Sequence, residues 1–137
     1  MTGALRIKVM AMAGLAALLT GAAPRPGGLA SAWPGMWEIS RSATGTNPQR
    51  VCLVDPAFFA RWEHRAATCA VNKLTERANL ATYDYRCVGG GFGRSDITLL
   101  TPRSLRIRTQ GILDGLPFDD TLHARWVRHC PSALNRH

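Results

Sequence analysis

Residues 69–87 have the sequence CAVNKLTERANLATYDYRC, which predicts a β-hairpin. Apolar and polar residues alternate on both sides of a central turn, as in strands that bury one face. We expect a three-residue loop over 77–79, because Asn79 tolerates the left-handed conformation that such a loop requires at its last position. The register then places the following residues opposite one another: Glu76 and Leu80, Lys73 and Tyr83, Val71 and Tyr85, and Cys69 and Cys87.

The chain contains four cysteines, an even number that is typical of a disulfide framework in a small exported domain. Four cysteines allow three pairings. The hairpin register selects one of them, because directly opposite Cβ atoms in a hairpin lie about 4.5–5.5 Å apart. We therefore predict the disulfides Cys69–Cys87 and, by exclusion, Cys52–Cys130. No two cysteines have the CxxC spacing, so the sequence predicts no zinc site built from them and His129.

One short helix is predicted directly after Cys52. Asp55-Pro56 combines an N-cap acceptor with a proline at the first helical position, so we expect the helix over 57–65. Its apolar stripe is expected to cover the open end of a sheet. Besides the hairpin, strands are predicted over 36–40, 49–54, 95–100, 104–109 and 121–128.

Two segments between these strands are predicted to be irregular. The glycine-rich residues 89–94 match no phosphate-binding motif and predict a flexible turn. Residues 111–118 contain Asp114-Gly115 and Pro117, so we expect a loop. The whole pattern predicts a mainly β fold. We expect a single antiparallel meander of six or seven strands, curled or half-barrel, with one short helix and two disulfides.

Residues 1–32 predict an export signal that precedes this domain. Arg6 and Lys8 come before an uncharged apolar stretch over 9–19. This stretch is shorter than the roughly 20 residues of a membrane-spanning helix, which argues against an uncleaved anchor.

Cleavage of the signal is predicted after Ala32, because Ala30-Ser31-Ala32 has the small-x-small pattern that a signal peptidase recognises. Cleavage after Ala23 is the alternative, but Pro24 would then follow the scissile bond. The prediction leaves a single domain over 33–137 in the periplasm or outside the cell, with no transmembrane span.

The chain is basic, with a formal net charge of +8. Such a charge favours loose association with anionic surfaces. Several arginines of the predicted strands and turns could form a basic face: Arg94, Arg103, Arg106, Arg108, Arg125 and Arg128. Because no stacking aromatic residues are expected beside them, we predict no nucleic-acid partner.

The candidate binding residues are aromatic. A curled sheet with a helix across it brings aromatic side chains near a concave surface, and such surfaces form pockets. We expect a small apolar molecule, a lipid or an envelope protein as the partner, with no cofactor, no metal and no catalytic residue. The predicted binding residues are Phe58, Phe59, Trp62, Tyr83, Tyr85 and Trp126.

Two other functions remain open. An inhibitor or protein-interaction module would make its contacts through residues 89–94 and 110–118. A hydrolase would use His123 with Asp119 or Asp120, since a carboxylate can orient an imidazole. A calcium site at Asp114 and these two aspartates is not predicted, because their spacing matches no known calcium loop.

Landmarks over residues 33–131 resemble a known family. They are Pro34-Gly35-Met36-Trp37-Glu38, Cys52 before a short helix, Cys69, the Tyr-x-Cys that ends at Cys87, and Cys130-Pro131. This order resembles the small exported bacterial proteins that share domain of unknown function thirty-six-seventeen. The chain differs from that family at Arg128-His129, where a Gly-x pair is common. The resemblance implies a location in the cell envelope and implies no activity or ligand.

Overall fold

A computed structural model describes Gly3 and residues 28–131 of the chain. Most of the predicted export signal and the last six residues lie outside the described residues. The elements are two 3-10 helices and seven strands: η1 (Gly28–Ser31), β1 (Gly35–Ser40), β2 (Gln49–Leu53), η2 (Pro56–His64), β3 (Cys69–Arg77), β4 (Leu80–Cys87), β5 (Phe92–Thr101), β6 (Ser104–Leu113) and β7 (Leu116–Arg128). The predicted mainly β fold is confirmed.

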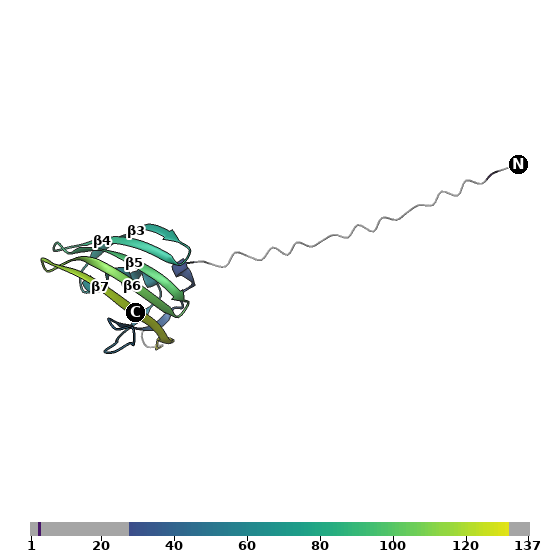
Figure 1. Ribbon diagram of the computed structural model, residues 1–137, viewed down its shortest axis with the longest axis horizontal. Helices are drawn as coiled ribbons and strands as arrows, with labels where there is room; N and C mark the ends of the chain where they lie inside the picture. Colours follow the sequence, from purple (N-terminus) through teal and green to yellow (C-terminus); the bar gives the residue numbers. More distant parts are fainter. Residues whose placement is uncertain (1–2, 4–27, 132–137) are drawn as a thin grey trace.

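The seven strands form one open antiparallel sheet in the order β2-β1-β7-β6-β5-β4-β3 (Figure 1). Strands β3 to β7 are a meander, and the β1–β2 hairpin extends it by pairing with β7. Strands β2 and β3 therefore lie at opposite edges of the sheet. The segment that joins them contains η2, which packs against β3, β4, β5 and β6 and covers one face, here called the inner face.

The β3–β4 hairpin has the predicted cysteine register but a different turn. Cys69 pairs with Cys87 as expected, whereas the predicted pairing of Glu76 with Leu80 is wrong. A bulge between Lys73 and Thr75 shifts the register by one residue, since it places one extra residue in β3. The turn therefore has two residues, 78–79. Ala78, not Asn79, takes the left-handed conformation, with φ of 48°.

Both predicted disulfides are present, and they tie different parts of the sheet. Cys69–Cys87 joins β3 to β4 within the hairpin. Cys52–Cys130 joins β2 to the segment after β7, so it links the two neighbours of β1. The described residues include no free cysteine.

The helix after Cys52 is present at the predicted place but is a 3-10 helix. Asp55 caps it by accepting a hydrogen bond from the backbone N–H of Ala57 at 2.9 Å, and Pro56 occupies its first turn. Arg61 has non-helical angles, φ −110° and ψ 27°, which divide the element into two short turns. The tighter 3-10 geometry is common in short pieces of this length.

The predicted loop over 111–118 is wrong, because strands β6 and β7 continue through it to a two-residue turn. Asp114 and Gly115 both have positive φ, 52° and 78°, as a tight hairpin turn requires. Pro117 is tolerated in β7 because this part of the strand pairs only with β6. The pairing of β7 with β1 begins at His123. The strand β5 likewise begins at Phe92, inside the predicted turn over 89–94.

The inner face holds the hydrophobic core. The side chains of Trp37, Ile97, Ile107 and Leu122 are buried there, beneath Phe59 of η2. Leu29 of η1 also belongs to this core, with 5% of its surface exposed. Residues of the predicted export signal therefore pack on the domain.

Candidate functional site

The predicted aromatic residues fill the core and do not line one common pocket. Phe59, Trp62, Tyr83 and Tyr85 are buried on the inner face, and Phe58 packs beside them. Trp126 lies at the other end of this face. Its indole N–H donates to the carbonyl of Pro34 at 3.1 Å, and its ring meets Trp33 edge to face.

A groove of about 550 Å³ lies at the end of the sheet where the β4–β5 and β6–β7 turns meet. We call it the hairpin groove. Tyr85 is the one predicted aromatic residue that lines it. Its lining comes from four neighbouring strands: Asp84, Tyr85, Arg86, Phe92, Gly93, Arg94, Gln110, Gly111, Ile112, Pro117 and Phe118. The segments 89–94 and 110–118, which the sequence marked as contact loops, therefore meet at one place.

Strand alternation assigns most of these side chains to the outer face, opposite η2. In β4, Tyr83 and Tyr85 are buried on the inner face, so Asp84 and Arg86 point outward. The glycines lie on the inner parity. A Cβ on Gly93 would meet the Tyr85 hydroxyl at 2.5 Å, so the tyrosine occupies the space that a side chain would need.

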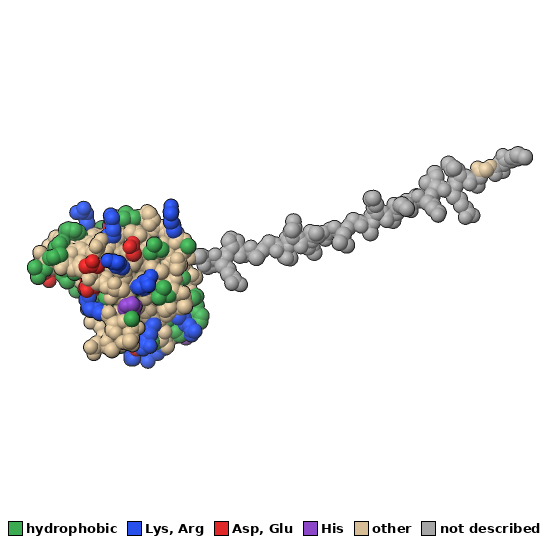
Figure 2. Space-filling model, in the orientation of Figure 1, with side chains coloured by type: hydrophobic (Ala, Val, Ile, Leu, Met, Phe, Trp, Pro, Cys, Tyr) green, Lys and Arg blue, Asp and Glu red, His purple; other side chains and the backbone are tan. Residues whose placement is uncertain are grey.

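One row of the groove is apolar apart from Arg86, which pairs with Phe92 at the end of the row. In the sheet register Ile112 pairs with Phe92 on one side and with Pro117 on the other. Phe92 is 45% exposed. Two more exposed apolar residues lie beside the turns, outside the groove lining: Val88 is 81% exposed, and Leu116, which has the opposite parity to Pro117, is 70% exposed. Figure 2 shows apolar side chains gathered at this left-hand end of the sheet.

The next row of the groove is polar. Arg94 pairs in register with Asp84 on one side and with Gln110 on the other. Arg94 and Arg86 are exposed and make no ion pair among the described residues. The Oδ1 atom of Asp84 is buried and has no hydrogen-bond partner within residues 28–131. The groove thus places a carboxylate and two guanidinium groups beside an apolar row.

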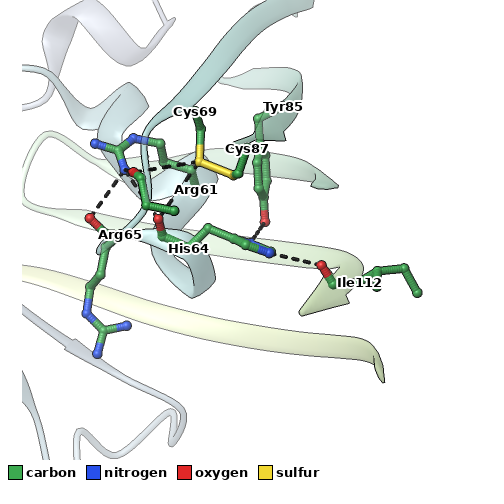
Figure 3. Close-up of a disulfide and its surroundings, with 8 residues drawn as sticks. Arg61, His64, Arg65, Cys69, Tyr85, Cys87 and Ile112 are labelled. Carbon is green, nitrogen blue, oxygen red and sulfur yellow. Dashed lines mark hydrogen bonds between the residues drawn. A yellow bond between two sulfur atoms is a disulfide. The ribbon is translucent and has the colours of Figure 1, made fainter. Parts of the chain in front are cut away.

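A buried histidine supports the groove from behind (Figure 3). The Nε2 atom of His64 lies 2.9 Å from the Ile112 carbonyl, and its Nδ1 atom lies 3.0 Å from the Tyr85 hydroxyl. A carbonyl can only accept, so Nε2 carries a hydrogen; in the neutral imidazole Nδ1 then accepts from the Tyr85 hydroxyl. Burial raises the pKa of Tyr85 to about 12, which keeps the hydroxyl protonated as a donor. His64 therefore fixes two residues of the groove lining.

The Cys69–Cys87 disulfide lies beside this histidine. Its Cys69 sulfur is 3.9 Å from the His64 carbonyl oxygen. The guanidinium of Arg61 donates to the carbonyl groups of His64, Arg65 and Ala67 and so closes the end of η2 (Figure 3). The hydrogen bond between His64 and Tyr85 holds η2 against the strand that carries Asp84 and Arg86, and the disulfide ties the start of β3 to that same strand.

The predicted basic face is mixed in charge. Glu38 accepts hydrogen bonds from Arg125 and Arg50, which hold its carboxyl pKa below the usual range. Arg108 lies 3.8 Å from Asp119, and Arg103 stacks on Trp33. Acidic groups therefore alternate with the arginines on this face (Figure 2).

The structure does not bring His123 together with the aspartates proposed for a hydrolase. Asp120 forms an ion pair with Arg41 at 2.7 Å, and Asp119 faces Arg108. His123 lies between Arg106 and Ser40 in the register. Within the described part of the chain, no group of three or more histidine, cysteine or acidic side chains is placed to hold a metal ion.

Sequence reasoning missed Asp84 and Arg86 of the groove lining, and it identified Phe92, Ile112 and Pro117 only as members of the two predicted contact segments, not as individual site residues. The signal for the hairpins was present as turn residues. The predicted meander already places alternate turns at the same end of the sheet; what the local patterns did not show is that residues 92–94 and 110–113 belong to strands whose outward side chains line the groove.

A scan against protein-family models, a search of curated proteins and a search of solved structures each found no match for this chain. None of the helices in residues 28–131 is long and apolar enough to cross a membrane. The two disulfides fit an extracellular or periplasmic protein, because such bonds persist in oxidising compartments.

Proposed function

We propose that this chain is a non-enzymatic binding protein of the bacterial envelope that takes an apolar ligand or lipid in the hairpin groove. The observation that carries the proposal is the groove itself. Its volume of about 550 Å³ is that of a site for a small molecule. Its lining combines an apolar row with a few polar groups, which is the usual composition of ligand sites.

Export and family membership belong to the same proposal. A basic start, an apolar stretch and a small-x-small site support an export signal within the first 32 residues. The two disulfides support an oxidising destination. The landmarks shared with domain of unknown function thirty-six-seventeen support the envelope and leave the ligand open.

The groove lining supports binding more than catalysis. Its polar side chains are carboxylate, guanidinium, amide and phenol groups, and it contains no serine, cysteine or histidine. A nucleophile with an adjacent base is the usual requirement of a hydrolytic site. We therefore assign the groove to recognition.

Binding is tested with 8-anilinonaphthalene-1-sulfonate, which has an apolar body and one anionic group. We expect its fluorescence to rise on mixing with the protein. Phe92→Asp should weaken binding about tenfold, since about 1.4 kcal/mol of apolar contact gives that factor. Val54→Asp is the matched control, because Val54 is exposed and lies outside the groove.

Equal binding by Phe92→Asp and the wild type would contradict the proposal, provided that thermal unfolding shows both to be folded. Native mass spectrometry of protein from its own periplasm gives a second test. Bound material that Phe92→Asp lacks would support the groove as its site, and consistently empty wild-type protein would count against it.

A protein-interaction module is the second candidate function. It is favoured by the exposure of Val88 and Leu116, which lie at the tips of neighbouring hairpins. Exposed apolar groups that cluster in this way commonly mark contact surfaces. Capture of an envelope protein that is abolished by Val88→Asp with Leu116→Asp, and unaffected by Phe92→Asp, would favour this function over ligand binding.

A further inference from the structure

Asp84 differs from every other acidic residue of the strands. Each of the others has a partner: Glu38 has Arg50 and Arg125, Glu76 has Lys73, Asp96 has Thr82, Asp119 has Arg108 and Asp120 has Arg41. Asp84 has none among the described residues, although its Oδ1 atom is buried. The side chain of Asp84 is only half-buried and lines the hairpin groove, so a ligand in the groove can reach the exposed part of the carboxylate and supply the donor that the chain does not.

The charged side chains around Asp84 indicate which charged groups such a ligand carries. Arg94 is the direct cross-strand neighbour of Asp84, and Arg86 is the next outward residue of the same strand. Directly opposite side chains have Cβ atoms about 4.5–5.5 Å apart. A ligand at this place therefore meets an acceptor and two cationic donors within a few ångströms, which suits an ammonium group next to an anionic group.

The apolar row sets the direction of the rest of the ligand. Phe92 and Ile112 lie two residues along their strands from Arg94 and Gln110, which is about 7 Å nearer the turns. Beyond them, towards the β4–β5 turn, is the exposed side chain of Val88. A ligand whose charged head lies on the polar row thus extends an apolar tail along Phe92, Ile112 and Pro117.

We infer that the hairpin groove recognises a zwitterionic amphiphile with a primary ammonium group, of the ethanolamine phospholipid class. Its ammonium donates to Asp84, and its phosphate accepts from Arg94 and Arg86. This assignment rests on the proposed function and adds the class of ligand. A choline head group has no N–H to donate to Asp84, and a glycerol head group has no cation.

The test compares lysophospholipids of equal chain length below their micelle concentration, by calorimetry on the whole mature protein. We expect the ethanolamine head group to bind about tenfold more tightly than the choline or glycerol head group, since one charge-assisted hydrogen bond separates them. Asp84→Asn should abolish this preference. Asp96→Asn is the matched control and should keep it, because Asp96 lies on the same face outside the groove.

The outcomes separate the two proposals. Equal affinity for the three head groups, or an unchanged preference in Asp84→Asn, overturns the head-group assignment while tail binding that Phe92→Asp weakens still supports the groove as a ligand site. Absence of binding by all three lipids and by the fluorescent probe overturns both. Phosphoethanolamine without a tail distinguishes a lipid from a soluble zwitterion. We expect it to bind much more weakly, and equal affinity would overturn the amphiphile assignment.

Discussion

The inner face of the sheet is closed by η2 and η1, whereas the outer face is open, and one strand serves both. In β6, Leu105 and Ile107 are buried on the inner face, while Arg106 and Arg108, which alternate with them, are exposed. The inner face is held by apolar burial, and the outer face by ion pairs such as Glu38 with Arg50 and Arg125. The comparison shows that the apolar burial that stabilises the sheet lies on one face, while the other face presents charged side chains to solvent.

The polar groups of the two faces follow the same distinction. On the inner face Ser95 is buried, and its hydroxyl lies 2.5 Å from the Ala60 carbonyl and 2.7 Å from the Thr109 hydroxyl. Such pairing is required where water cannot reach. On the outer face each strand carboxylate has a partner within the described part of the chain except Asp84, so the exception lies within the hairpin groove.

The largest effect is expected from neighbouring residues of β6 that point to opposite faces. Ile107→Ala should lower the free energy of unfolding by about 2–5 kcal/mol, because it removes buried methylene groups and leaves a cavity. Arg108→Ala should change it by no more than about 0.5 kcal/mol. Urea unfolding followed by circular dichroism measures both. Similar losses in the two variants would remove the distinction between the faces.

A smaller effect is expected where η1 covers the inner face. Leu29→Ala should destabilise the domain by about 2–3 kcal/mol, since Leu29 is in the core although it precedes the predicted cleavage site. Val54→Ala, at an exposed position, is the control. We also expect the exported protein to retain Leu29.

The intact mass of the exported protein identifies its N-terminal residue and so shows whether η1 is kept after cleavage. A chain that begins at Trp33 and is as stable as one that begins before Gly28 would show that η1 is dispensable. A chain that begins upstream of Gly28 would favour cleavage near Ala23 over cleavage after Ala32.

The smallest effect is expected from the outer-face ion pairs, through pH. Arg125 and Arg50 lower the pKa of Glu38 in the folded protein below its ordinary value of 4.5. The ionised carboxylate therefore contributes stability above about pH 4.5, and this contribution is lost as the pH falls through the lower folded value. Glu38→Gln should narrow the difference in unfolding free energy between pH 7 and pH 3. Parallel pH profiles for the variant and the wild type would contradict this.

Local patterns in the sequence determined the parts of the fold that depend on near neighbours. The cysteine register was predicted from a three-residue loop; the turn has two residues, and the bulge in β3 adds the residue that keeps Cys69 opposite Cys87. The start of η2 followed from the cap at Asp55-Pro56. Two cysteines that lie directly opposite each other in a hairpin are close enough to form a disulfide, so their pairing depends only on the local register. The pairing Cys52–Cys130 then followed by exclusion, because one disulfide leaves one possibility for the other.

Only the tertiary structure decided what depends on strand order and on cumulative register. The bulge in β3 moved the turn by one residue, and the free edge of β7 allowed Pro117 to lie in a strand. The hairpin groove exists because two turns that are distant in sequence lie at one end of the sheet. Nothing in the sequence around Asp84 distinguishes it from the other acidic residues of the strands. It differs from them only in the fold, where none of its described neighbours pairs with it. Main-chain hydrogen bonds between strands do not depend on which side chains the strands carry. The alternation of residues along a strand therefore predicts which face each residue takes, but alternation alone does not predict which strand lies beside it.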